Sequence, residues 1–190
     1  MTASTIIIAK KKRKISWENF KIKYLSREDN YKYEWVDGYV EKTRRIMDDK
    51  QLFILENIFA FFDKIKAENS IDGRLISEVD TFFAGKHRRP DISFFTRQQI
   101  KDARTGSNKI PPQFLIEIIS STDQINRVQR KMQNYLKAKV KVVWHIFPEF
   151  KMVHVYTGKK MLICKEADIC SANSVIKGFE ISADDIFKES

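Results

Sequence analysis

The chain has 190 residues, of which 43% are hydrophobic and 12% aromatic, so it has enough apolar sequence to form a globular core rather than a disordered chain. Its 35 lysine and arginine residues exceed its 25 acidic residues, and the net charge of +10 favours a polyanionic partner, although charge alone supports nucleic acid only weakly. Two cysteines exclude a disulfide scaffold and no apolar run approaches the length of a membrane span, so we expect a protein of the cytoplasm.

A basic tail precedes the expected domain. Residues 10–14 read Lys-Lys-Lys-Arg-Lys, and we expect residues 1–15 to form a flexible, solvated tail, with a phosphate-contacting arm as the alternative. Residues 16–190 are expected to form a single domain. Ser16 can cap a short helix that extends to about Leu25.

A β-hairpin is expected next. The residues from Tyr33 to Thr43 alternate around Asp37-Gly38, a dipeptide that favours a two-residue hairpin turn. Glu34 lies on this hairpin, where it is either a cross-strand partner for a lysine or a site residue.

The following segment predicts a long helix and a strand. Asp48 and Gln51 have the spacing of a capping box, and an apolar stripe continues to about Glu68. Asp72-Gly73 then predicts a turn into a strand over residues 74–83, and residues 85–89 are expected to connect it to the next strand.

Two apolar segments each carry one carboxylate. Pro90-Asp91 opens the segment 92–95, and Glu117 lies inside the segment 114–119, which is typical of a buried strand. An ionised carboxylate on such a strand is costly to bury unless a cation or a metal ion pairs with it. The alternatives are therefore structural ion pairs with Arg88 or Arg89, or a functional site.

A basic helix follows Glu117. Asp123 can cap it, and an apolar stripe at helical spacing predicts that one face packs on the sheet. Lys131 lies at the border of that stripe, so its side chain can extend either to solvent or toward the end of the sheet. Asp91, Glu117 and Lys131 together are compatible with metal-assisted hydrolysis of a phosphodiester bond.

The C-terminal part predicts further strands. Residues 141–147 and 150–157 are expected to form a hairpin around Pro148-Glu149, followed by a strand over residues 161–165. His145 and His154 lie in these strands without metal-ligand spacing, and satisfied structural histidines are the commoner case.

Taken together, these segments resemble the Uma-type family of putative restriction endonucleases (domain of unknown function 820), within the PD-(D/E)XK nuclease superfamily. No single motif is specific, but six occur in the family's order over most of the chain. The segments that carry the resemblance are Glu34-Trp35-Val36-Asp37-Gly38, Arg89-Pro90-Asp91, Glu117-Ile118-Ile119-Ser120, Lys131 with Tyr135, the strand around Trp144, and Gly178-Phe179-Glu180 leading to Asp184-Asp185-Ile186-Phe187.

The resemblance implies an α/β (α+β) restriction-endonuclease-like fold, with a mixed central sheet flanked by helices and an N-terminal β-hairpin. It implies a divalent-metal-dependent endonuclease in which Asp91 and Glu117 hold magnesium or manganese, Lys131 is catalytic and Glu34 supports the site. The chain departs from the pattern at two positions. The superfamily's lysine normally follows the second acid by two residues, where this chain has Ile119, and Arg127 stands where the family often has an acid.

The expected partner is nucleic acid, most readily DNA, and a homodimer is expected from the superfamily resemblance alone. Arg88 and Arg89 before the first acidic strand, and Arg127 and Arg130 on the basic helix, are the expected phosphate contacts. The first alternative is a catalytically decayed nucleic-acid-binding module on the same fold. The second is an interaction domain whose basic face binds an acidic protein.

Overall fold

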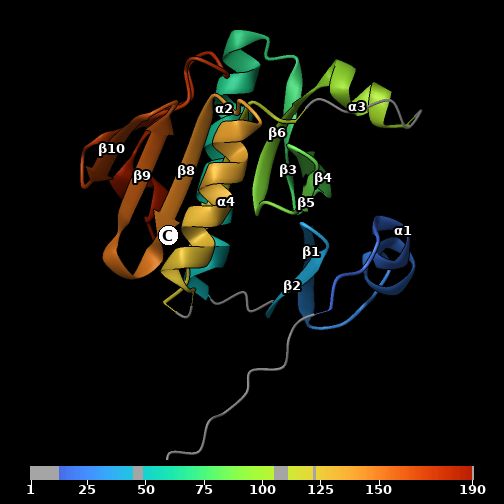
Figure 1. Ribbon diagram of the computed structural model, residues 1–190. Coiled ribbons are helices and arrows are strands. Elements are labelled where there is room, and N and C mark those ends of the chain that lie inside the picture. Colours follow the sequence, from blue (N-terminus) through green and yellow to red (C-terminus); the bar gives the residue numbers. More distant parts are fainter. Residues whose placement is uncertain (1–12, 45–48, 105–110, 122, 190) are drawn as a thin grey trace, which may run out of the picture. The chain divides into compact units, whose positions relative to one another are not determined.

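The computed structural model describes residues 13–44, 49–104, 111–121 and 123–189 (Figure 1). The chain divides into two compact units, an N-terminal unit that ends at Arg45 and a C-terminal unit that begins at Ile46. The expectations for residues 1–12 and for the cap at Asp48 lie outside the described residues, and a single domain over residues 16–190 stays a prediction. None of the described helices combines the length and the hydropathy that crossing a membrane requires.

The N-terminal unit contains a capped helix and a hairpin. Helix α1 (Trp17–Phe20) continues into the π-helical turn η1 (Lys21–Leu25), and the Ser16 hydroxyl accepts a hydrogen bond from the amide of Asn19, as a cap requires. Strands β1 (Tyr31–Val36) and β2 (Tyr39–Arg44) pair antiparallel. Asp37 and Gly38 both have positive φ, which is the type I′ turn expected from this dipeptide.

A mixed six-stranded sheet forms the centre of the C-terminal unit, as expected. Its strand order is β10-β9-β8-β7-β6-β3. Strands β7 and β8 run parallel, whereas β3–β6, β6–β7, β8–β9 and β9–β10 are antiparallel. The strands are β3 (Gly73–Ser77), β6 (Ile92–Thr96), β7 (Phe114–Ile118), β8 (Val142–Phe147), β9 (Met152–Thr157) and β10 (Lys160–Lys165).

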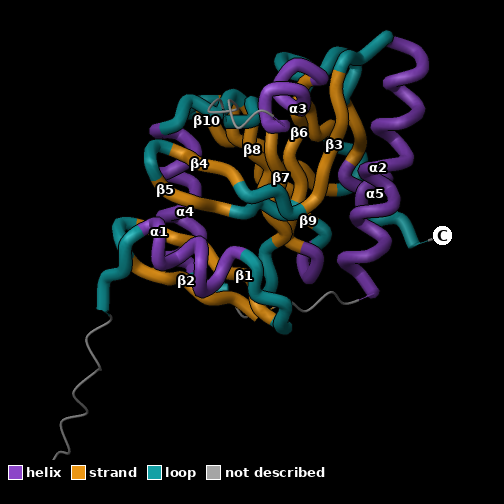
Figure 2. The backbone as a smooth tube through the Cα atoms, turned by 90° about the vertical axis from the view of Figure 1, so that its right-hand side faces the viewer, coloured by secondary structure: helices purple, strands orange, loops and turns teal. Residues whose placement is uncertain are grey.

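Helices cover the two faces of this sheet (Figure 2). The larger core lies on one face and includes α2 (Asp49–Asn69), α5 (Ala183–Ile186) and the short pair β11 (Ile169–Ser171) and β12 (Glu180–Ser182). The smaller core lies against α4 (Ile125–Lys137) on the other face. Phe114 and Ile116 of β7 belong to the first core and Leu115 to the second, so the alternation along β7 also places Glu117 on the α4 face.

The region between β3 and β6 differs from the expectation. The strand expected over residues 74–83 is interrupted at Glu78, whose φ is +51°, so that β3 and β4 (Thr81–Phe83) are separate. The segment expected as a connection contains β5 (Lys86–Arg88), which pairs with β4 across the Ala84-Gly85 turn. This second hairpin packs on α4, where the Phe83 and Tyr135 rings meet edge to face at 4.7 Å.

Of the remaining connections, the turns on either side of β9 follow the sequence signals, whereas the helix after β6 was not predicted. Helix α3 (Arg97–Arg104) begins directly after β6, at the end of that strand opposite to Asp91. Strands β8 and β9 are joined by the 3-10 turn Pro148–Phe150, which confirms the hairpin expected around Pro148-Glu149. Gly158, with φ +60°, starts the two-residue turn between β9 and β10.

Candidate active site

Asp91 lies at the start of β6, beside the end of β7. Its Oδ2 accepts a hydrogen bond of 2.7 Å from the amide of Ile118, and its backbone carbonyl accepts one of 3.1 Å from the amide of Glu78. The antiparallel register pairs Ile92 with Ile116, so Asp91 is one step further along, opposite Glu117. The two predicted carboxylates therefore come from neighbouring positions of adjacent strands.

Glu117 is bound by two side chains of α4. Lys131 Nζ lies 2.9 Å from Oε2 and 3.1 Å from Oε1, and the Tyr135 hydroxyl donates to Oε1. The side chain of Glu117 is 4% exposed and that of Lys131 is 13% exposed. Lys131 therefore extends toward the sheet and not into solvent, and the helix supplies the cation that the buried carboxylate requires.

The ends of α4 fix where Lys131 and Tyr135 lie. The predicted cap at Asp123 is wrong by one residue, because Gln124 is the N-cap and Asp123 Oδ2 instead accepts bonds from the amide and hydroxyl of Ser120. At the other end, the amide of Val140 bonds to the Tyr135 carbonyl and that of Lys139 to the Leu136 carbonyl. This is a Schellman motif, and Lys139 occupies its left-handed position with φ +60°.

The two arginines that precede Asp91 make contacts inside the C-terminal unit. Arg88 is fully buried, and its Nε and Nη2 donate to Asn134 Oδ1 on α4 at 3.2 and 2.8 Å. Arg89 makes a two-pronged pair with Asp80 at 2.7 and 2.8 Å. These arginines therefore stabilise the β4–β5 hairpin and its packing on α4. Their contacts here are structural, whereas the sequence led us to expect contacts with phosphate.

Asp80 is also the partner of His87, whose Nε2 lies 2.8 Å from Oδ1. Burial raises the pKa of Asp80, but the hydrogen bonds with His87 and Arg89 outweigh it and hold the pKa below its usual value. The carboxylate is thus kept ionised as a structural anchor.

The other two predicted phosphate contacts lie on α4. Arg130 is exposed and Arg127, one turn before Lys131, is half-buried. Both precede Lys131 on the same helix. Of the four arginines predicted to contact phosphate, Arg130 is the one that is exposed, so its guanidinium is the most accessible to a ligand from solvent.

His145 was expected to be a satisfied structural residue, and the geometry differs. It lies on β8 opposite Glu117 of β7 and opposite His154 of β9, and only 1% of it is exposed. Within the described part of the chain, neither ring nitrogen of His145 has a hydrogen-bond partner. Burial, then His154 and Lys131, lower the pKa of His145 to about 4, so the ring is neutral at pH 7. The strand alternation, which puts residues 143 and 145 on one face, is the signal that could have placed it beside Glu117.

The carboxylates of Asp91 and Glu117 could supply some, but not all, of the ligands of a hard divalent cation. Asp91 and Glu117 offer carboxylate oxygens, which magnesium and manganese prefer, and magnesium commonly uses one or two carboxylates together with waters and substrate phosphate. The described residues contain no group of three or more His, Cys, Asp or Glu side chains arranged to hold a metal ion. The two carboxylates are therefore compatible with a metal shared with substrate and not with a closed structural site.

Glu34 lies on β1 of the N-terminal unit, opposite Glu41 of β2. Its contribution to the site stays a prediction.

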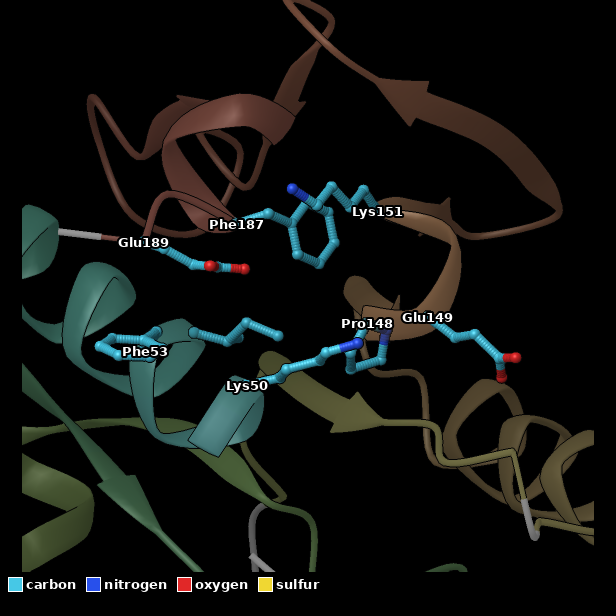
Figure 3. A pocket seen from close by; sticks show the side chains of 8 residues that line it. Lys50, Phe53, Pro148, Glu149, Lys151, Phe187 and Glu189 are labelled. Atoms are coloured by element: carbon cyan, nitrogen blue, oxygen red, sulfur yellow. The ribbon is translucent and has the colours of Figure 1, made fainter. Parts of the chain in front are cut away.

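A separate hollow with a volume of about 80 Å³ lies near the end of the chain (Figure 3). None of the predicted site residues lines it, and its charged side chains are of both signs, which suits neither a phosphate backbone nor a metal ion. The lining residues are Lys50, Phe53, Ile54, Pro148, Glu149, Lys151, Phe187 and Glu189.

Comparison with known proteins identifies the fold and the family of this chain. A solved structure, that of a putative nuclease belonging to DUF820 from Anabaena variabilis ATCC 29413, superposes with a TM-score of 0.70 at 22% sequence identity, covering 82% of this chain and 89% of that chain. At this identity the similarity establishes the fold, which is the nuclease-like fold expected from the sequence. No curated protein matches the chain. The model of the Uma2 family, described as putative restriction endonuclease, matches residues 17–184. The chain therefore belongs to the Uma2 family of putative restriction endonucleases.

Proposed function

We propose that this protein is a divalent-metal-dependent endonuclease that hydrolyses phosphodiester bonds, with DNA as its substrate. The observation that carries the proposal is the convergence of Asp91, Glu117 and Lys131: two carboxylates from paired positions of adjacent strands, with an ammonium bound to the second. Membership in the Uma2 family supports nuclease chemistry.

Asp91 and Glu117 would hold magnesium or manganese through their oxygens. When bound, the cation supplies Lewis-acid polarisation of the scissile phosphate and acidifies an attacking water. Asp91 keeps its carboxylate fixed through the Ile118 amide, and Tyr135 fixes that of Glu117, so neither carboxylate reorganises freely when substrate arrives.

Lys131 supplies the positive charge that the superfamily pattern places two residues after the second acid. That position is Ile119, whose amide extends the pairing of β7 with β8 by bonding to the Ile146 carbonyl at 2.8 Å. From α4, the Lys131 ammonium stabilises the negative charge that develops on the phosphoryl oxygens. Since it bonds to both oxygens of Glu117, it must share that carboxylate when a metal ion binds.

The flanking residues have supporting roles in the proposal. Arg130, exposed on α4, contacts the phosphate backbone, and Arg127 contributes positive potential one turn before Lys131. Glu34 supports the site from the N-terminal hairpin.

The test is cleavage of supercoiled plasmid and of single-stranded DNA with magnesium or manganese, comparing wild type with Asp91→Asn and Glu117→Gln. Asn keeps an oxygen acceptor for the Ile118 amide, so Asp91→Asn should fold while losing the ligand charge. Asp63→Asn, an exposed carboxylate on α2, is the matched control. We expect cleavage by wild type and the control and none by the two site variants. Equal cleavage by all four proteins, or none by folded wild type, contradicts the proposal.

A second candidate is a nucleic-acid-binding module that has lost catalysis. The observation in its favour is that Lys131 already neutralises both oxygens of Glu117 and that Ile119 replaces the usual lysine. This candidate predicts DNA binding that weakens steeply with salt, together with no cleavage under any metal condition.

A further inference from the structure

Helix α4 covers only part of its face of the six-stranded sheet. Leu115 of β7 and Val143 of β8 are buried in the core that it covers, whereas Tyr156 of β9 is only half-buried there. In Figure 1, α4 lies in front of β8, and β9 and the edge strand β10 extend to its left beyond the helix. The side chains of β9 and β10 on this face are therefore the ones that solvent reaches.

The strand register connects this open part of the sheet to the candidate site. Residues directly opposite each other on paired strands direct their side chains to the same face of a sheet. Glu117 lies opposite His145, and His145 lies opposite His154. His154 in turn lies opposite Ile163 of β10. Because Glu117 is on the α4 face, one row of side chains on that face runs from the candidate site to the edge of the sheet.

Aromatic rings and apolar side chains surround this row. The centroid of the His154 ring lies 4.6 Å from that of Phe147 and 6.2 Å from that of Tyr156. These three rings are half-buried, so each keeps part of its surface in contact with solvent. Met161, opposite Tyr156, and Ile163 are 51% and 47% exposed. We call this surface the apolar face; its residues are Phe147, His154, Tyr156, Met161 and Ile163.

The charges around the apolar face are mainly positive. From the residue before β8 to the end of β10, residues 141–165 contain one acidic residue, Glu149, and five lysines. Lys165 is exposed and lies opposite Met152, on the same side of the sheet as the apolar face. At the other end of the row, Lys131 is bonded to Glu117, and Arg130 is exposed on α4. The lysines of residues 141–165 are Lys141, Lys151, Lys159, Lys160 and Lys165.

We propose that the apolar face binds unpaired bases of single-stranded DNA, whose sugar-phosphate backbone passes the candidate site at Glu117 and Lys131. An exposed apolar surface beside a site commonly marks a place where a ligand binds. Lysines around it favour a polyanion over a neutral apolar partner. The inference rests on the proposed function and specifies its substrate as single-stranded.

Duplex DNA suits this surface less well than a single strand. In a duplex the faces of the bases are stacked on one another, and only their edges and the phosphates meet a protein. An unpaired base instead offers its π-face, which stacks on rings and packs on apolar side chains, while lysines and arginines bind the phosphates. A single strand therefore matches both the apolar face and the positive charge around it.

The first test compares two single strands that carry the same phosphates. The probes are a fluorescent oligothymidylate of about twelve nucleotides and an abasic strand of the same length, with calcium in place of magnesium. We expect the full chain to bind the oligothymidylate about tenfold more tightly than the abasic strand, and more tightly than a duplex of that length, in fluorescence anisotropy. Equal affinity for the two single strands, or tighter binding of the duplex, overturns the proposal.

The second test locates the bases on the protein with two neighbouring residues. Leu162 is 58% exposed but lies opposite Val155, a member of the larger core, so it is on the other face of the sheet. Ile163→Trp should bind oligothymidylate about fivefold more tightly than wild type and lose tryptophan fluorescence on binding, because a base stacks on the new ring. Leu162→Trp, the matched control, should do neither. The native Trp17, Trp35 and Trp144 are present in both variants, so the difference between the variants reports the new ring.

Thermal unfolding of the two variants checks that both are folded. Equal quenching in Ile163→Trp and Leu162→Trp, or none in either, contradicts a base site on the apolar face. Failure of wild type to bind either single strand also overturns the inference and leaves the apolar face to a protein partner.

Binding measured without cleavage separates this inference from the proposed function. Base-dependent binding together with no cleavage in magnesium or manganese would overturn the proposed hydrolysis and support the apolar face as a binding site. Cleavage by a protein that binds the abasic strand as tightly as the oligothymidylate would support hydrolysis and overturn the inference.

Discussion

Glu117 is a buried carboxylate whose charge is balanced by Lys131 and whose position is held by Tyr135. Removing one partner of a buried ion pair destabilises a protein by more than the intact pair stabilises it, because the remaining charge stays desolvated. We therefore expect Lys131→Met to lower the free energy of unfolding by about 3 kcal/mol, measured by urea denaturation at neutral pH.

The control for this prediction is Lys137→Met, which removes an exposed lysine from the last turn of the same helix and should change stability by less than about 0.5 kcal/mol. Combining Lys131→Met with Glu117→Gln should recover part of the loss, because no ionised group is then left buried. If Lys131→Met and Lys137→Met were equally stable, the ammonium of Lys131 would not be paired with Glu117 in solution.

The lowered pKa of His145 predicts that the stability of the protein depends on pH. Its pKa is about 4 in the folded protein, against 6.5 for an ordinary histidine, and the groups that face it are Glu117, His154, Tyr156 and Lys131. As pH falls below 6.5 the unfolded chain takes up a proton that the folded chain does not, so stability is lost between pH 6.5 and about 4. From about pH 7 to about pH 4.5 this histidine should account for about 2–3 kcal/mol of lost stability.

The measurement is the free energy of unfolding of wild type and of His145→Leu across this range. The variant should show a shallower decline, although Asp80, whose pKa is lowered, also loses its contribution as pH falls. Parallel curves for the two proteins would mean that His145 takes up its proton at the same pH in the folded and the unfolded chain.

The residues of the site were partly predictable. Asp91 and Glu117 could be recognised because a carboxylate inside an apolar strand is costly and therefore informative. The orientation of Lys131 and the pairing of Arg88 with Asn134 could not, since each depends on which elements the tertiary structure brings together. The position of Lys131 at the border of the apolar stripe is compatible with both orientations, and only the packing of α4 on β7 decides between them.

At the scale of elements, α4 ends in a Schellman motif that orients Tyr135 and Asn134. Lys139 holds its left-handed position, with φ +60°, where a side chain is strained and glycine is not. Lys139→Gly should therefore stabilise the protein by about 0.5–1 kcal/mol in thermal or urea unfolding. Lys137→Gly, inside the last turn, should instead destabilise it by a similar amount. If Lys139→Gly lowers stability as Lys137→Gly does, the helix does not end in this motif.

Elements with strong periodicity or turn chemistry were predicted well, and those set by long-range pairing were not. The Asp37-Gly38 hairpin and the helix after Glu117 have local signals, and both are present. The break at Glu78 depends on its bond to the Asp91 carbonyl, thirteen residues away along the chain. Strand β5 contains only Lys86, His87 and Arg88, which local propensity places in a loop, and its strand conformation is stabilised by pairing with β4.

At the scale of the whole molecule, the sequence predicted a mixed sheet flanked by helices but not the strand order. A parallel neighbour for β7 follows from the helix that connects β7 to β8, since such a crossover returns the chain in the same direction. No comparable local rule predicts that β3 pairs with β6 or that a hairpin separates these two strands in the sequence. The charge distribution was readable, because residues 123–141 hold six basic side chains against one acid.

Because basic side chains are concentrated in this region, the salt dependence of DNA binding tests whether helix α4 contacts the nucleic acid. Each phosphate contact lowers log K by about 0.9 per unit of log salt for duplex DNA, so losing one contact should reduce the slope by about one. Arg130→Gln removes an exposed cation of α4 next to Lys131, and Lys64→Gln removes an exposed cation of α2 on the opposite face of the sheet. We expect a shallower slope for Arg130→Gln and an unchanged slope for Lys64→Gln, measured by fluorescence anisotropy with calcium in place of magnesium. If the two variants change the slope equally, binding follows net charge and α4 is not the surface that meets the nucleic acid.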